Sequence, residues 1–211
     1  MARLWAKMYL AVAGINVRIE GLARLGSPPY VLMVNHQSAL DIYALLAALP
    51  LSFKWIAKRQ LFRIPVFGWA IRKAGYISID RENAREALKA MEKAAQRIRQ
   101  GATIIIFPEG TRSADGKLLP FKKGGFTLAL RAAVPVVPVG ISGSSVLQPK
   151  GCFIPREKGI IYIEVGEPIV LEGMDRSQKT QVMDDVRVRI EELIAKGGSS
   201  GGKGGRGRPG P

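Results

Sequence analysis

The chain has 211 residues, enough to bury one sizeable hydrophobic core, and this length predicts a single domain. It has one cysteine and one histidine, and these counts exclude an internal disulfide framework, a cysteine-based metal cluster and the usual kind of zinc site. The formal net charge is +15. So large a positive charge favours three classes of anionic partner: nucleic acid, an anionic bilayer surface and phosphorylated small molecules.

The first segment of the chain has the pattern of an amphipathic helix. Its large apolar side chains recur at helical spacing, at Leu4, Trp5, Met8, Val12 and Ile15. With Arg3 and Lys7 facing a headgroup layer, such a helix can lie in a membrane interface, and the alternative is a first helix packed on the protein's own core. No run approaches the ~18 uninterrupted apolar residues that a spanning helix needs, and no secretory signal is apparent. We therefore assign residues 1–20 to a membrane-associating segment on the cytosolic face.

Residues 21–196 alternate between strand and helix patterns. Short runs rich in valine, isoleucine and aromatic residues predict buried strands at 30–34, 53–57, 76–79, 103–107, 136–141 and 160–165. Helical stripes of apolar residues cover 82–100, ended by Gly101, and 182–194, ended by Gly197. The alternation predicts one layered α/β domain, with a largely buried mixed or parallel sheet flanked by helices and its function in the loops at strand ends.

The last residues differ in composition from the rest. Residues 197–211, GGSSGGKGGRGRPGP, contain almost nothing apolar and are expected to form a disordered tail, so the folded part ends near Lys196. Four cations lie on Lys196, Lys203, Arg206 and Arg208, which leaves 11 of the 15 net positive charges on residues 1–195. The basic character is therefore not produced by the tail.

The only histidine follows the apolar run YVLMV, in the string NHQSALD. Asn35 and Ser38 are turn and helix-cap residue types, so His36 should lie in a strand-to-helix loop, with Asp41 one turn into the helix. A lone histidine is usually structural. However, a histidine held in one tautomer by a carboxylate is a good base for removing the proton of an alcohol near neutral pH, and this pair suits that reaction.

The string FPEGTRS at residues 107–113 directly follows the run TIII. Gly110 allows a positive φ or a close approach of a ligand, and Arg112 is suited to bidentate capture of a phosphate. Glu109 would repel a phosphate, so we expect it to pair with a cation or to accept a substrate hydroxyl. Taken alone, the string is also typical of an ordinary solvated loop.

Two further strings complete the pattern. Residues 58–69, KRQLFRIPVFGW, mix cations with bulky apolar groups, as an amphipathic substrate requires, and Arg81 adds a cation after the strand YISID. The alternative for residues 58–69 is a surface loop over a small hydrophobic cluster. Residues 134–143, VPVVPVGISG, are expected to be structural.

In this order and spacing, the four strings resemble the 1-acyl-sn-glycerol-3-phosphate acyltransferase family. NHQSALD is similar to that family's motif of a histidine and an aspartate separated by four residues, and FPEGTRS is similar to its phosphate-site motif. The likeness covers about residues 1–170. One departure is Gln60, where the family commonly has an acidic residue.

The resemblance implies transfer of an acyl group from acyl-CoA or acyl carrier protein to the sn-2 hydroxyl of 1-acyl-sn-glycerol-3-phosphate, giving phosphatidic acid. It implies no cofactor and no metal, and a peripheral place on the cytoplasmic face of the inner (plasma) membrane. By that likeness His36 is the general base and Asp41 orients it. The residues implied to hold the glycerol phosphate are Glu109, Gly110, Thr111 and Arg112, with Arg81 and Lys58 assisting.

Other interpretations stay open. The acceptor could be another lysolipid, such as a lyso-ornithine lipid. A serine esterase would need a G-x-S-x-G elbow directly after a strand and would accumulate a trapped acyl-enzyme. The sequence matches this pattern only within residues 197–202 of the Gly-rich tail, where no predicted strand precedes it. A basic membrane- or nucleic-acid-binding module is the non-enzymatic rival, and deleting residues 197–211 would weaken a tail-driven RNA binder but spare acyl transfer. We expect no nucleic-acid partner.

Overall fold

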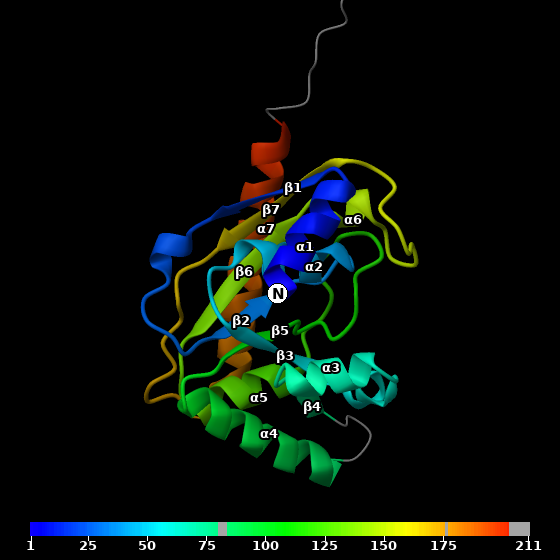
Figure 1. Cartoon of the computed structure of the whole chain (residues 1–211). Helices are drawn as coiled ribbons and strands as arrows, with labels where there is room; N and C mark the ends of the chain where they lie inside the picture. The colour runs from blue at the N-terminus through cyan, green and yellow to red at the C-terminus, as the bar shows by residue number, and fades with distance from the viewer. Residues whose placement is uncertain (80–83, 176, 203–211) are drawn as a thin grey trace, which may run out of the picture.

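A computed structural model of the chain describes residues 1–79, 84–175 and 177–202 (Figure 1). Within this part, seven strands form one sheet in the order β1-β7-β6-β2-β5-β3-β4. Neighbouring strands are parallel except β6 and β7, which are antiparallel. The strands are β1 (Ile15–Glu20), β2 (Val31–Val34), β3 (Phe53–Lys58), β4 (Ile77–Ile79), β5 (Thr103–Ile106), β6 (Val136–Ser142) and β7 (Gly159–Val165). The predicted α/β domain with a mixed sheet is confirmed.

Helices cover both faces of this sheet. One face packs against α1 (Ala2–Val12), α2 (Leu40–Ala48) and α6 (Ser144–Leu147), and the other against α4 (Ala84–Arg99), α5 (Lys123–Ala132) and α7 (Lys179–Gly202). Figure 1 shows α1 in front of the sheet and α7 behind it. Alternation along β2 explains the two cores, because Val31 and Met33 point to one and Leu32 and Val34 to the other. The short elements are η1 (Leu22–Arg24), η2 (Arg59–Arg63) and α3 (Phe67–Lys73).

All six predicted strands form, and each end lies within one residue of its expected place. The α4 helix stops where predicted, since Gly101 adopts a φ of 103° just after it. Residues 80–83, which include the predicted start of this helix, lie outside the described residues. Among the described helices, none combines the length and the apolar character needed to cross a membrane.

The N-terminal segment is divided between a helix and a strand. The helix ends at Val12, and Ile15, which the sequence pattern placed on its apolar stripe, is instead the buried first residue of β1. β1 pairs in parallel with β7, with Ile15 opposite Gly159 and Glu20 opposite Glu164. The sequence pattern does not reveal this strand, because its exposed positions carry the polar or charged residues Asn16, Arg18 and Glu20 and so interrupt the apolar run. Residues 15–20 therefore belong to the sheet.

The last helix runs past its expected end. Gly197 was predicted to stop it, yet α7 continues to Gly202, while residues 203–211 lie outside the described part. Gly197 is buried against the sheet, and a Cβ there would lie 2.7 Å from Ser142 Oγ and 3.2 Å from Tyr162 Cβ. The glycine thus permits close packing of helix on sheet, and this role explains it better than a helix stop.

Parallel register brings two loops together at one edge of the sheet. Val31 of β2 lies opposite Ile104 of β5, and Met33 lies opposite Ile106. The chain therefore leaves β2 at Asn35 and leaves β5 at Phe107 side by side. Loops at the carboxyl ends of adjacent parallel strands commonly form ligand sites.

Candidate active site

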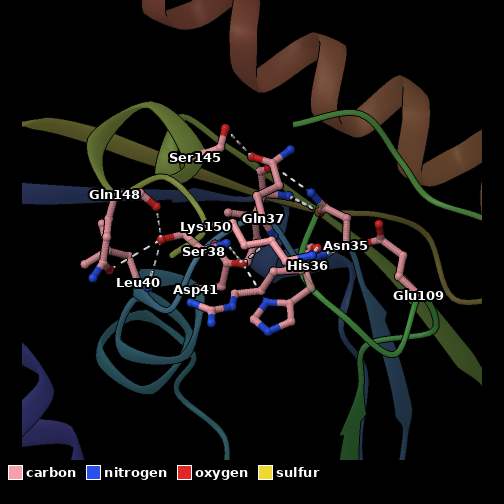
Figure 2. Close-up of polar contacts among 12 residues, drawn as sticks. Asn35, His36, Gln37, Ser38, Leu40, Asp41, Glu109, Ser145, Gln148 and Lys150 are labelled. Atoms are coloured by element: carbon pink, nitrogen blue, oxygen red, sulfur yellow. Dashed lines mark hydrogen bonds and ion pairs between the residues drawn. The ribbon is translucent and has the colours of Figure 1, made fainter. Parts of the chain in front are cut away.

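His36 and Asp41 form a hydrogen-bonded pair at the end of β2. Nδ1 of His36 lies 2.8 Å from Oδ2 of Asp41, which is in the first turn of α2 (Figure 2). The same oxygen accepts the backbone N–H of Gln37 at 2.7 Å and that of Ser38 at 2.9 Å. Asp41 is fully buried, so its carboxylate is held by the fold and in turn holds the imidazole. The structure brings together the two residues that the sequence paired.

The pair fixes the proton arrangement of the imidazole. The carboxylate accepts a hydrogen bond from Nδ1–H of the neutral imidazole, which leaves the lone pair on Nε2. The His36 side chain is 14 % exposed, so the imidazole is not sealed inside the protein. Such an arrangement can accept a proton from a bound hydroxyl.

Phe107 holds the face of the imidazole. The two ring centroids lie 3.9 Å apart with an interplanar angle of 11°, and Trp55 of β3 stacks behind Phe107 with centroids 5.3 Å apart. The Asp41 bond and this stack together restrict both the tilt and the rotation of the His36 ring. The role of Phe107 could not be predicted, because its contact with His36 depends on the pairing of β2 with β5.

Backbone amides hold the side chain of Glu109. Its side chain is buried, and its two carboxylate oxygens accept backbone N–H groups of His36 at 2.6 Å and of Leu119 at 2.8 Å. Burial raises the pKa of Glu109 above its usual value, although these two bonds oppose the shift. In this structure its partners are therefore backbone amides of two loops that fold over the carboxylate, and a cation or a substrate hydroxyl as a further partner stays a prediction.

Replacing Glu109 by glutamine should weaken the hydrogen bonds that hold the loop of His36. The amide keeps one acceptor but turns an NH₂ toward a backbone N–H, and an unsatisfied buried donor costs about 1–3 kcal/mol. We expect a melting temperature lower by about 2–4 °C for each kcal/mol lost, together with a lower kcat, because His36 loses its backbone anchor. Calorimetry and steady-state kinetics measure both.

The matched control for this change is Glu192→Gln, which makes the same replacement on the exposed face of α7 and should leave melting and kcat as in the parent. A rise in KM for the acceptor alone, with melting and kcat unchanged, would show instead that Glu109 holds substrate.

The loop that carries Arg112 lies against the histidine. Gly110 has a φ of 72° and its N–H closes a turn on the Phe107 carbonyl, while the N–H of Ser113 donates to the His36 carbonyl at 2.8 Å. Thr111 is exposed and Arg112 is half-buried. Arg112 is thus one residue from a direct contact with the His36 loop, and the two predicted strings form one site.

Of the two remaining predicted cations, the structure describes the position of Lys58 but not that of Arg81. Lys58 is the last residue of β3 and lies opposite Ile79 of β4, at the same strand-end edge as the site. Arg81 lies outside the described residues. Gln60 lies in η2, and beyond it Ile64, Val66 and Trp69 are exposed while Phe62 is buried, so the string has an apolar surface above a buried aromatic side chain.

Two residues predicted to be turn and cap types serve as anchors. The Asn35 side chain accepts the N–H of Ile141 at 2.6 Å and donates to its carbonyl at 2.9 Å, which ties the end of β2 to β6. The Ser38 hydroxyl donates to the Gln148 carbonyl at 2.8 Å and accepts the N–H of Leu40 at 3.2 Å. The loop that bears His36 is therefore bound to its neighbours on both sides.

Arg187 on α7 supports the site from a distance. Its guanidinium donates to the carbonyls of Leu119 at 3.0 Å and Leu118 at 3.2 Å and lies over the ring of Phe121. Leu119 in turn bonds Glu109. No sequence signal could have found this residue, because the contact joins segments 68 residues apart.

A cavity of about 270 Å³ opens beside the FPEG turn. It lies between the end of β5 and the helices α4 and α5, and its lining is mostly apolar, with Met91, Phe107, Gly125 and Leu128 among the residues that form it. Because Phe107 lines the cavity and also stacks on His36, the apolar cavity adjoins the imidazole.

No cluster of histidine, cysteine, aspartate or glutamate suited to holding a metal ion occurs in the part of the chain that the structure describes.

Comparison with known proteins gives consistent matches. A family model described as Acyltransferase matches residues 16–142. The chain is 37% identical over 196 residues to the chloroplastic 1-acyl-sn-glycerol-3-phosphate acyltransferase BAT2 of Brassica napus, covering 92% of this chain and 55% of that protein. It is 36% identical to the human 1-acyl-sn-glycerol-3-phosphate acyltransferase alpha, over 90% of this chain and 68% of that one. The chain spans about half the length of its plant relatives.

A solved structure matches as well. The crystal structure of the 1-acyl-sn-glycerophosphate (LPA) acyltransferase PlsC from Thermotoga maritima superposes with a TM-score of 0.79 at 29% identity, covering 92% of this chain and 77% of that one. The similarity therefore extends to nearly the whole chain and is not confined to the motifs.

Proposed function

Because the chain belongs to the 1-acyl-sn-glycerol-3-phosphate acyltransferase family, we propose that it moves an acyl group from acyl-CoA or acyl carrier protein to the sn-2 hydroxyl of 1-acyl-sn-glycerol-3-phosphate, giving phosphatidic acid. The observation that carries the proposal is the buried Asp41 carboxylate bonded to His36, with the Arg112 loop bonded to the same histidine's backbone.

In the proposed reaction, Nε2 of His36 removes the proton of the acceptor hydroxyl as its oxygen attacks the thioester carbonyl carbon. The tetrahedral intermediate collapses with cleavage of the carbon–sulfur bond, and the imidazolium returns its proton to the departing thiolate. Asp41 stabilises the imidazolium that forms between the two steps. General-base catalysis contributes about 10² to 10⁴ in rate, so alignment of the two substrates must supply much of the rest.

The acceptor phosphate is assigned to the Arg112 loop. A guanidinium can bind two phosphate oxygens at once, and the exposed Thr111 places a hydroxyl beside it in the same loop. Lys58 and Arg81 are proposed to assist. Glu109 is proposed to position the loop, because its oxygens are already bonded to backbone amides.

The apolar cavity beside Phe107 is proposed to take part of an acyl chain, since its lining is apolar and it begins at the catalytic stack. The excess of positive charge suits both thioester carriers, which are anionic, and the choice between them is left to the assay below.

A place on the cytoplasmic face of the inner (plasma) membrane is also proposed, with α1 as the attachment. One face of α1 packs on α2 through Ala6 and Leu10, and the opposite face leaves its large apolar side chains in solvent: Leu4, Trp5, Met8 and Val12. The two alternatives for this helix are therefore compatible. Arg3 and Lys7 are both exposed, and Arg3 also donates to the Leu49 and Ala47 carbonyls at the end of α2.

The test is a product assay with purified protein, 1-acyl-sn-glycerol-3-phosphate and either long-chain acyl-CoA or acyl carrier protein. We expect phosphatidic acid by mass spectrometry with at least one donor. A lyso-ornithine lipid serves as the competing acceptor, and faster acylation of that lipid would transfer the proposal to the other lysolipid. Failure to acylate either acceptor with either donor would end it.

A further inference from the structure

The segment between α6 and β7 ends in an exposed apolar tip. Phe153 is 97 % exposed and Ile154 is 73 % exposed, and Val146 on α6 is also exposed. Figure 1 shows this segment, in yellow, standing out from the body beside α6 and α1. Single exposed apolar residues are common on proteins, but two adjacent bulky ones at a loop tip indicate a contact surface.

Hydrogen bonds hold the base of this loop, so its tip is presented by a folded turn. The Cys152 N–H donates to the Pro149 carbonyl at 3.1 Å, and the Gln148 side chain donates to the Cys152 carbonyl at 3.1 Å. On the far side of the tip, the Arg156 N–H donates to the Leu147 carbonyl at 2.8 Å. The tip therefore does not fold back to bury its own side chains.

The base of the loop is bonded to the proposed active site. Ser38, two residues from His36, donates its hydroxyl to the Gln148 carbonyl, and Lys150 Nζ donates to the Arg112 carbonyl at 2.7 Å (Figure 2). A surface that engages Phe153 and Ile154 is thus held at a fixed place relative to the catalytic pair.

Charge and neighbourhood identify the partner. Residues 149–158 carry three cations, on Lys150, Arg156 and Lys158, against the single carboxylate of Glu157, and all four are exposed. The end of the loop lies against the end of α1, where Gly159 N–H donates to the Gly14 carbonyl. Val12, two residues before Gly14, is 90 % exposed, so an exposed apolar side chain of α1 lies near the end of the loop. Apolar side chains ringed by cations match an anionic bilayer interface.

We propose that Phe153 and Ile154 insert into the interface of an anionic phospholipid bilayer, with Arg156 and Lys158 at the headgroups, and so set the mouth of the active site against the membrane. The insertion forms a second attachment beside α1. Membrane insertion of the loop is a property separate from acyl transfer. It rests on the proposed function only in its purpose, which is to give the active site access to an acceptor in the bilayer.

The experiment compares the parent with Phe153→Ser/Ile154→Ser, using vesicles of phosphatidylglycerol and phosphatidylcholine in equal parts. Losing burial of two large apolar side chains is expected to lower the partition coefficient about tenfold or more, with the melting temperature unchanged because both are exposed. Val170→Ser/Val188→Ser makes a comparable change at exposed sites away from the loop and should partition like the parent. Leu4→Glu/Met8→Glu provides the comparison for loss of the α1 attachment.

Activity separates this proposal from acyl transfer itself. The loop variant should lose turnover on acceptor embedded in vesicles but keep the parent's turnover on a short-chain, monodisperse acceptor. If the Phe153→Ser/Ile154→Ser variant partitions onto vesicles as the parent does, the proposed insertion is wrong, and the exposed tip would then be a surface for a protein partner. If the parent transfers no acyl group to any acceptor, the proposed function fails. The vesicle partitioning measurement still tests whether the loop inserts into the membrane.

Discussion

Replacement of His36 by alanine is expected to lower kcat for acyl transfer by at least about 10², because the acceptor hydroxyl then loses the base that removes its proton. KM for the acceptor should change little, since the phosphate is assigned to a different loop. The fold should survive, as the buried Asp41 carboxylate keeps the backbone N–H groups of Gln37 and Ser38 as donors. Steady-state kinetics with a saturating thioester, together with a melting curve, measure both.

The control for this variant is the melting curve itself, because the chain has no second histidine to replace. A kcat within a few-fold of the parent's, in a variant that melts like the parent, would remove His36 from the chemistry and leave the His36–Asp41 pair a structural role.

Replacement of Arg112 by alanine is expected to lower kcat/KM for 1-acyl-sn-glycerol-3-phosphate by about 10- to 100-fold, the value of one charge-assisted bidentate contact. Lysine at this position should recover only part of the loss, because its ammonium cannot match two oxygens of a phosphate at once. An acceptor without a phosphate, such as a monoacylglycerol, should be acylated at a low rate that the substitution leaves unchanged.

Arg99→Ala on α4 is the matched control, since it removes the same charge at an exposed site far from Arg112 in the fold. An equal loss in both variants would mean that net charge, and not a local phosphate contact, governs the acceptor. A loss that is the same for acceptors with and without phosphate would assign Arg112 to the donor.

The fold could be predicted where apolar runs are continuous. β2 and β5 are buried on both faces, so the continuous apolar runs VLMV and TIII predict them directly. β1 could not be found in the same way, because an edge strand with one exposed face alternates between apolar and charged residues. The strand order and the antiparallel pairing of β6 with β7 depend on contacts between segments far apart in sequence, and the sequence pattern carries no trace of them.

The candidate site could be predicted where its contacts are local. His36 and Asp41 are five residues apart on a loop and the first helical turn, and spacing alone places them together. The amides of His36 and Leu119 that bond Glu109 could not be predicted, because they come from loops whose approach only the fold determines. For the same reason Arg187 was missed. Residue type indicated the chemistry, while tertiary contacts decided which groups remain open to a substrate.

A double-mutant cycle on His36 and Asp41 tests most directly whether the two act as one base. kcat is measured for His36→Ala, Asp41→Asn and the combined variant, with melting curves to exclude unfolding. The paired base predicts that Asp41→Asn alone is slow and that the combined variant is no slower than His36→Ala, because the carboxylate acts only through the imidazole. Losses that multiply in the combined variant would contradict it and give the two residues independent roles.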